Sequence, residues 1–87
     1  MDESKGKILI IDDEAEIRES LEILLVFEGY QVDTAEDGTS GVTALEAKPY
    51  DLVLLDLMLP DRPGLEVLEE LQVTARRIYG KRQRPYG

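Results

Sequence analysis

Two short, unbroken runs of apolar residues, each ending in aspartate, constrain the fold more than any other feature of the chain. Residues 8–11 (Ile-Leu-Ile-Ile) are followed at once by Asp12 and Asp13, and residues 52–55 (Leu-Val-Leu-Leu) are followed by Asp56. Aliphatic runs without polar alternation are typical of strands that are buried on both faces. Because such strands occur in parallel sheets covered by helices, the two runs predict an α/β protein.

The residues between the two runs predict a helix and a weaker strand. Ile17, Leu21 and Leu24 recur at helical spacing after the acidic cluster, with charged residues between them, and Gly29 suits the end of this helix. Residues 31–35 alternate in polarity and form the weakest strand pattern, as expected for an edge strand. The first half of the chain therefore has the order strand, helix, strand.

The second half continues the same alternation. Residues 37–40 (Asp-Gly-Thr-Ser) offer turn and N-cap chemistry for a short helix that stops before Pro49. After the strand at 52–55 and a loop, apolar residues at helical spacing predict a third helix over 65–79. The order β-α-β-α-β-α predicts a doubly wound parallel sheet with right-handed crossovers. We expect one domain over residues 1–79 and a basic tail over 80–87.

The composition excludes several classes of site and partner. The 87 residues contain no cysteine and no histidine, so disulfides, zinc sites and haem sites are not expected, and any metal should be a hard ion held by oxygens. Residues 1–7 are polar, and no apolar run approaches the roughly 20 residues of a membrane span. We therefore expect a cytoplasmic protein without a membrane partner.

The net charge of −9 is unevenly distributed. Residues 1–75 contain 5 basic and all 19 acidic residues, a formal charge of −14, whereas the last twelve residues carry five basic ones. The acidic body argues against nucleic acid as a partner. The basic end could contact nucleic acid or an acidic surface, but we interpret it as a solvated helix end and tail.

Three carboxylates are expected to converge if the first and third strands are neighbours. In an open parallel sheet, ligands bind outside the carboxyl ends of the strands, where Asp12, Asp13 and Asp56 would then meet. Among three like charges at close range, one is normally protonated or neutralised by a cation. Mg²⁺ fits best, because it takes a few carboxylates, keeps several waters and also binds phosphate oxygens. The alternative is that each acid merely occupies an exposed strand end.

These residues resemble a known family. Residues 8–14 (Ile-Leu-Ile-Ile-Asp-Asp-Glu) and 51–60 (Asp-Leu-Val-Leu-Leu-Asp-Leu-Met-Leu-Pro) are similar to the receiver domains of bacterial response regulators, the CheY-like superfamily. Residues 61–68, with Gly64 in the loop, and the segments 28–32 and 35–38 extend the resemblance over about residues 7–71. It implies a flavodoxin-like fold, which in this family has five βα units and strand order 2-1-3-4-5.

The resemblance implies a signalling role rather than an enzyme. Asp56 would accept a phosphoryl group from a sensor histidine kinase, and Asp13, Asp56 and the backbone carbonyl of Met58 would bind Mg²⁺. Asp12 would act largely through water. Pro60 and Gly64 would shape the loop beside the acceptor, a role that ordinary turn residues fill equally well.

The chain departs from the family after the third βα unit. The hydroxyl residue after strand four and the lysine after strand five have no counterpart, because Thr74 and Lys81 do not follow apolar, strand-like runs. The fold is then an incomplete sheet of order 2-1-3, and signalling should be impaired. An exposed edge at strand 52–55 and the helix over 65–79 would favour a homodimer or higher oligomer that completes the sheet.

Two other functions remain open. The chain could be a non-signalling, self-assembling receiver fragment with a relic acidic pocket, which the missing lysine and hydroxyl residue favour. A phosphatase of the dehalogenase-like type also uses an aspartate after a buried strand. That type requires a second aspartate two positions after the first, but the residue two positions after Asp12 is Glu14.

Overall fold

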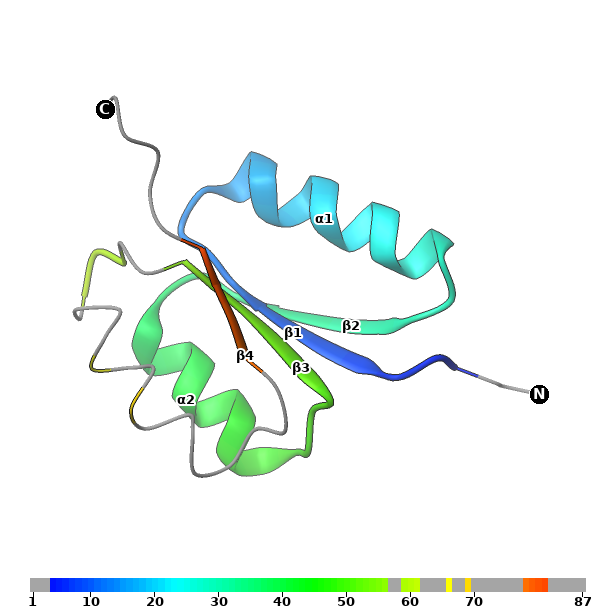
Figure 1. Ribbon diagram of the computed structural model, residues 1–87. Coiled ribbons are helices and arrows are strands. Elements are labelled where there is room, and N and C mark those ends of the chain that lie inside the picture. The colour runs from blue at the N-terminus through cyan, green and yellow to red at the C-terminus, as the bar shows by residue number, and fades with distance from the viewer. Residues whose placement is uncertain (1–3, 57–58, 62–65, 67–68, 70–77, 82–87) are drawn as a thin grey trace.

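The computed structural model describes residues 4–56, 59–61, 66, 69 and 78–81. The elements follow one another as β1 (Lys7–Ile11), α1 (Ala15–Phe27), β2 (Gln31–Ala35), α2 (Gly38–Ala47), β3 (Leu52–Asp56) and β4 (Ile78–Lys81). The two helices lie on opposite faces of the sheet (Figure 1). The first five elements agree closely with the ranges expected from the sequence.

The strands form one parallel sheet in the order β2-β1-β3-β4. β1 pairs with β2 on one side and with β3 on the other, and Ile11 is in register with both Ala35 and Leu55. The flavodoxin-like strand order 2-1-3 is therefore confirmed, as is the position of β2 at an edge. Since β1 is central, all four residues after Lys7 in this strand are buried.

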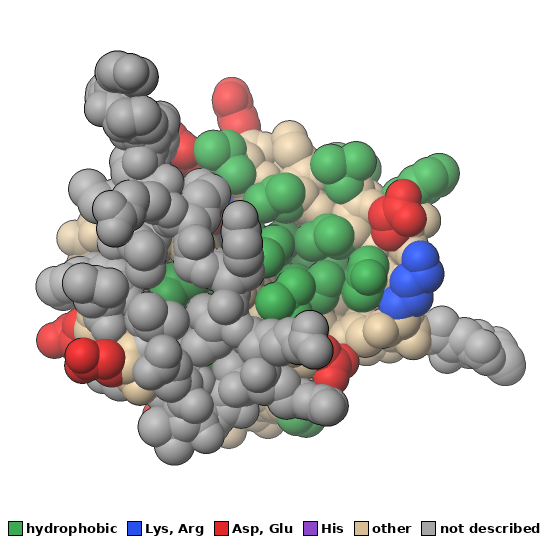
Figure 2. Space-filling view, in the orientation of Figure 1, with side chains coloured by type: hydrophobic (Ala, Val, Ile, Leu, Met, Phe, Trp, Pro, Cys, Tyr) green, Lys and Arg blue, Asp and Glu red, His purple; other side chains and the backbone are tan. Residues whose placement is uncertain are grey.

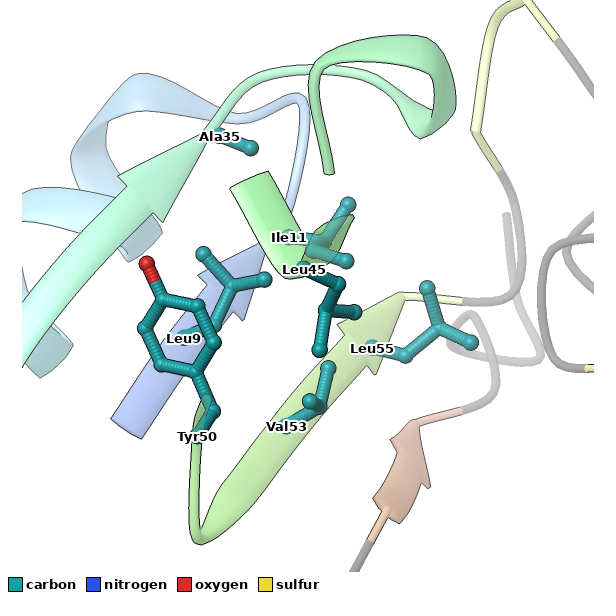
Figure 3. Packing of buried hydrophobic residues seen from close by; sticks show 7 residues of the cluster. All are labelled: Leu9, Ile11, Ala35, Leu45, Tyr50, Val53 and Leu55. Atoms are coloured by element: carbon teal, nitrogen blue, oxygen red, sulfur yellow. The ribbon is translucent and has the colours of Figure 1, made fainter. Parts of the chain in front are cut away.

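The main core lies between the sheet and α2. Alternate residues of β1 and β3 point to this side, where they meet α2 and the ring of Tyr50 (Figure 3). The cluster comprises Leu9, Ile11, Ala35, Leu45, Tyr50, Val53 and Leu55. Gly41 allows the close approach of α2, because a Cβ at this position would lie 2.5 Å from Cδ1 of Ile11. The packing of α2 is thus specified by residues of β1.

The opposite side of the sheet is less completely covered. α1 contains no buried residue, and Leu52 and Leu54, which alternate with the buried Val53 and Leu55, are only half-buried. Hydrophobic side chains gather over α1 and the adjoining sheet in Figure 2. β1 is therefore buried on both faces, as its apolar run predicts, whereas one face of β3 is only half-buried.

The chain after β3 differs from the expectation. Residues 78–81 form β4, in parallel register with β3, so the prediction of a helix reaching residue 79 is wrong at that end. Pairing with β4 also removes the exposed edge that was expected at residues 52–55. Glu66 and Glu69 are helical, and the rest of the expected helix up to residue 77 lies outside the described residues.

The expected division at residue 79 falls within β4 and stays a prediction. Among the residues that the structure describes, none forms a helix with the length and apolar character that a membrane crossing requires.

Candidate functional site

Three carboxylates meet at the carboxyl ends of the two central strands. Asp56 is the last residue of β3, and Asp12 and Asp13 directly follow β1, which is its neighbour in the sheet. One carboxylate oxygen from each of these residues lies within 4.8 Å of the other two. The geometric prediction from the sequence is confirmed, because parallel pairing of Ile11 with Leu55 brings the following residues to the same edge.

The turn that carries Asp12 is held by its own backbone and side chain. The Asp12 amide donates to the carbonyl of Ala35 at 3.1 Å, and the Glu14 amide donates to Oδ1 of Asp12 at 3.0 Å. Nη1 of Arg18, on the first turns of α1, donates to the Asp12 carbonyl at 2.8 Å. These bonds fix the direction in which the chain leaves β1, and so they orient the acidic pair.

Burial differs among the three acids. Asp12 and Asp56 are 2% and 1% exposed, whereas Asp13 is open to solvent. A carboxylate that is buried beside another carboxylate requires compensation by a cation or by hydrogen bonds. The cluster therefore combines two shielded oxygen donors with one that faces water, an arrangement in which an ion could keep part of its hydration shell.

The donor set suits a hard divalent cation. Magnesium takes oxygen ligands at about 2.1 Å and usually keeps several waters beside a few carboxylates. The oxygens of the cluster lie within 4.8 Å of one another, so a single ion could be held by some of them directly and by the others through water. The residues that are present therefore fit Mg²⁺.

The loop after β3 is tied to the start of α2. Oδ1 of Asp61 accepts a hydrogen bond from the Gly38 amide at 2.9 Å, and Oδ2 accepts from the Thr39 amide at 3.0 Å and the Thr39 hydroxyl at 2.9 Å. These donors lower the pKa of Asp61, with the Gly38 amide as the largest cause. Asp37 caps the same helix by accepting from the Ser40 amide at 2.8 Å.

Sequence reasoning assigned Asp61 only to a loop and missed its contact with α2. A signal was available, because the loop after β3 and the start of α2 both lie at the carboxyl edge of the sheet. An acidic residue in that loop is thus close to backbone amides that have no partner within their own helix.

The remaining residues considered for the site come after β3 in the chain, the last of them in β4. Met58 and Gly64 lie outside the described residues, and Pro60 is exposed in the loop between Asp56 and Asp61. Lys81 was expected to have no role in the site, because no strand was predicted before it. The structure places Lys81 at the end of β4, with its Cα in register with that of Asp56.

Comparison with protein families gives one match that covers most of the chain. The family model described as "Response regulator receiver domain" matches residues 8–79. The transcriptional regulatory protein YkoG of Bacillus subtilis is 49% identical over 70 residues, which are 80% of this chain and 31% of that protein. DltR of Streptococcus agalactiae is 46% identical over 66 residues, 76% of this chain and 30% of its own length. The chain thus spans about a third of these curated relatives.

Solved structures show the same fold. A receiver protein from Methanoculleus marisnigri superimposes with a TM-score of 0.83 and 34% identity, over 94% of this chain and 72% of that chain. The response regulator TrrA of Thermotoga maritima gives a TM-score of 0.74 and 33% identity, over 86% of this chain and 85% of its own. That structure of TrrA is a complex with Mg²⁺ and beryllofluoride.

Proposed function

Since the chain belongs to the response regulator receiver family, we propose that it is a cytoplasmic phosphoacceptor domain in which Asp56 accepts a phosphoryl group from a sensor histidine kinase. The observation that carries this proposal is the cluster at the ends of β1 and β3. Asp56 is buried there beside two further carboxylates, with their oxygens within 4.8 Å. Members of this family are signalling domains of two-component systems, and the cluster occupies the family's usual site.

Asp13 and Asp56 would hold Mg²⁺ directly, with the Met58 carbonyl as a third ligand and Asp12 acting largely through water. The bound ion would neutralise negative charge on the transferred phosphoryl oxygens. The complex of TrrA with Mg²⁺ and beryllofluoride supports this assignment, because that protein is similar over 86% of this chain. The three acids of this chain supply the oxygen donors that such an ion requires.

The transfer needs little from the protein beyond position and charge. One carboxylate oxygen of Asp56 would form a bond to phosphorus as the bond from phosphorus to the donor histidine nitrogen breaks, and that nitrogen would keep the electron pair. The product is an acyl phosphate. Because Asp56 is 1% exposed, its surroundings would slow attack by water on the product.

Small phosphodonors test the proposal without a cognate kinase. Incubation with acetyl phosphate and Mg²⁺ should add one phosphoryl group to the intact protein, detected by mass spectrometry, and Asp56→Asn should abolish the addition. Asp51→Asn is a matched control, because Asp51 lies just before β3, at the opposite end of that strand. Absence of the phosphoryl adduct in the wild type, together with no response to beryllofluoride, would contradict the proposal.

A second candidate function is a self-assembling receiver fragment with little signalling output. The exposed apolar residues of α1 favour it, because uncovered apolar surface promotes association. A homodimer or higher oligomer stays a prediction, but it cannot use the edge of β3, which pairs with β4. Light scattering at micromolar concentration decides the point, and a folded monomer there would refute self-assembly. Impaired signalling likewise stays a proposal.

A further inference from the structure

We propose that Asp61 is a positioning residue of the acidic site, which it serves by tying the loop after Asp56 to the first turn of α2. This inference rests on the proposed function, because it concerns the affinity of the same site for Mg²⁺. Both oxygens of the Asp61 carboxylate are used, and their three bonds to Gly38 and Thr39 measure 2.9–3.0 Å. A single acid therefore joins two segments that are 22 residues or more apart in the chain.

The contact completes the first turn of α2. The first amides of a helix have no partner within it, and here the Gly38 and Thr39 amides donate to Asp61 while the Ser40 amide donates to Asp37. The positive end of the helix dipole adds to the attraction for a carboxylate. Asp61 is therefore held by directed bonds as well as by charge.

The helix to which Asp61 is tied is itself packed against the strand that leads into the site. Gly41 lies so close to Ile11 that a Cβ would lie 2.5 Å from the Ile11 side chain. Ile11 immediately precedes Asp12 in the chain. The α2 end of the contact is thus fixed relative to the acids that follow β1.

The loop between Asp56 and Asp61 is held at both ends. β3 fixes Asp56, and the contact with α2 fixes Asp61 only five positions later. The three bonds of Asp61 therefore tie the chain that leaves Asp56 to α2, and α2 in turn packs against Ile11, the residue before Asp12. Loss of these bonds would remove a link between Asp56 and the two acids that follow β1. Release of Asp61 should therefore weaken ion binding although Asp61 itself would not contact the ion.

Hydrogen exchange in the wild type provides a readout that a purely structural role would not change. Binding is reciprocal: if the Asp61 contact favours Mg²⁺, then Mg²⁺ must favour the contact. Added Mg²⁺ should slow exchange of the Gly38 and Thr39 amides. The Lys7 amide, which donates to Asp51 at 2.9 Å near the opposite end of the sheet, serves as the internal control and should change less.

Paired variants measure the size of the effect by calorimetric titration with Mg²⁺. Asp61→Asn keeps the shape but leaves only one acceptor oxygen, and we expect about a tenfold loss of affinity, in the range seen for residues that support metal ligands. Thr39→Val removes only the hydroxyl bond, so it should cause a smaller loss in a protein that keeps the rest of the contact. Asp51→Asn removes a comparable bond to a backbone amide far from the site and should leave the affinity unchanged.

The outcomes separate this inference from the proposed function. If the wild type binds Mg²⁺, and both Asp61→Asn and Thr39→Val match it in affinity with no exchange response at Gly38 and Thr39, the positioning role is overturned while the proposed function stands. If the wild type does not bind Mg²⁺, the proposed function fails and the positioning role fails with it. Weaker binding in Asp61→Asn, but not in Asp51→Asn, supports the role.

Discussion

Helices α1 and α2 carry apolar residues on opposite faces of one sheet, yet these residues are buried very differently. α2 buries Gly38, Gly41 and Leu45, and it meets the main core of the molecule. α1 is longer and richer in aliphatic residues, but it buries none of them. Its large apolar side chains that are exposed are those of Ile23, Leu24, Val26 and Phe27.

The difference shows that the apolar content of a helix does not determine its contribution to the core. The face of β3 toward α2 is buried at Val53 and Leu55, whereas Leu52 and Leu54 on the other face are half-buried. The α2 side is also the side to which Asp61 ties the loop after Asp56. Packing and the candidate site are therefore coupled through α2.

The largest expected difference in stability is between leucine-to-alanine substitutions in α2 and in α1. Leu45→Ala should reduce the free energy of unfolding by about 2–5 kcal/mol, since Leu45 is buried in the core. Leu24→Ala, at a side chain that is 59% exposed, should change it by no more than about 0.5 kcal/mol. Urea denaturation followed by circular dichroism measures both. Equal losses would show that α1 is covered in solution.

An added methyl group on α2 should have the next largest effect on stability. Gly41→Ala places a Cβ against Ile11, and crowding of this kind costs about 1–3 kcal/mol of the free energy of unfolding. Ser20→Ala, at an exposed position of α1, is the control and should change stability by no more than about 0.5 kcal/mol. Ile11→Val removes the closest atom, so the double variant with Gly41→Ala should lose less than the sum of the two. Simple additivity would contradict this close packing.

The hydroxyl of Tyr50 connects the α2 core to the edge strand β2. It donates to Oδ2 of Asp33 at 2.5 Å, and this bond is the main reason why the pKa of Asp33 is lowered. The amines of Lys48 and Lys7 also lie within 4 Å of that carboxylate. Burial, followed by the bond to Asp33, raises the pKa of Tyr50. Because Asp33 remains about a third exposed, we expect Tyr50→Phe to cost only about 1 kcal/mol at pH 7.

The pH dependence of that loss follows from the sign of the shift. A carboxyl group with a lowered pKa in the folded state stabilises the fold above its unfolded pKa of about 3.9, and this contribution disappears as the pH falls through the folded value. The difference in stability between wild type and Tyr50→Phe should therefore shrink below about pH 4. A difference that stays constant with pH would show that Asp33 is not the partner that matters.

The smallest effect on stability is expected on the exposed side of α1. Phe27→Ser, at a side chain that is 84% exposed, should change the free energy of unfolding by no more than about 0.5 kcal/mol. It should nevertheless lower the fluorescence of a dye that binds apolar surfaces, because it removes an exposed ring. Glu28→Ser, at the adjacent exposed position, is the control and should not lower it. Unchanged dye binding in Phe27→Ser would indicate that the ring is covered in solution.

Much of the fold could be predicted because the local patterns were unambiguous. The apolar runs in β1 and β3 and the helical spacing in α1 mark elements that are specified by neighbouring residues. β4 was missed since Ile78 and Tyr79 continue a helical spacing and are followed by Gly80 and Lys81, which is not a strand pattern. Its pairing depends on the free edge of β3, which lies more than 20 residues earlier in the chain.

The sequence by itself determined that three aspartates follow central strands, and parallel pairing then places them at one edge of the sheet. Only the tertiary structure decided which face of β3 is fully buried, that β4 covers its edge, and that Asp61 bonds to the first turn of α2. The physical reason is range. Periodicity and strand termini are properties of consecutive residues, whereas burial and hydrogen bonds to distant amides depend on how separate elements pack.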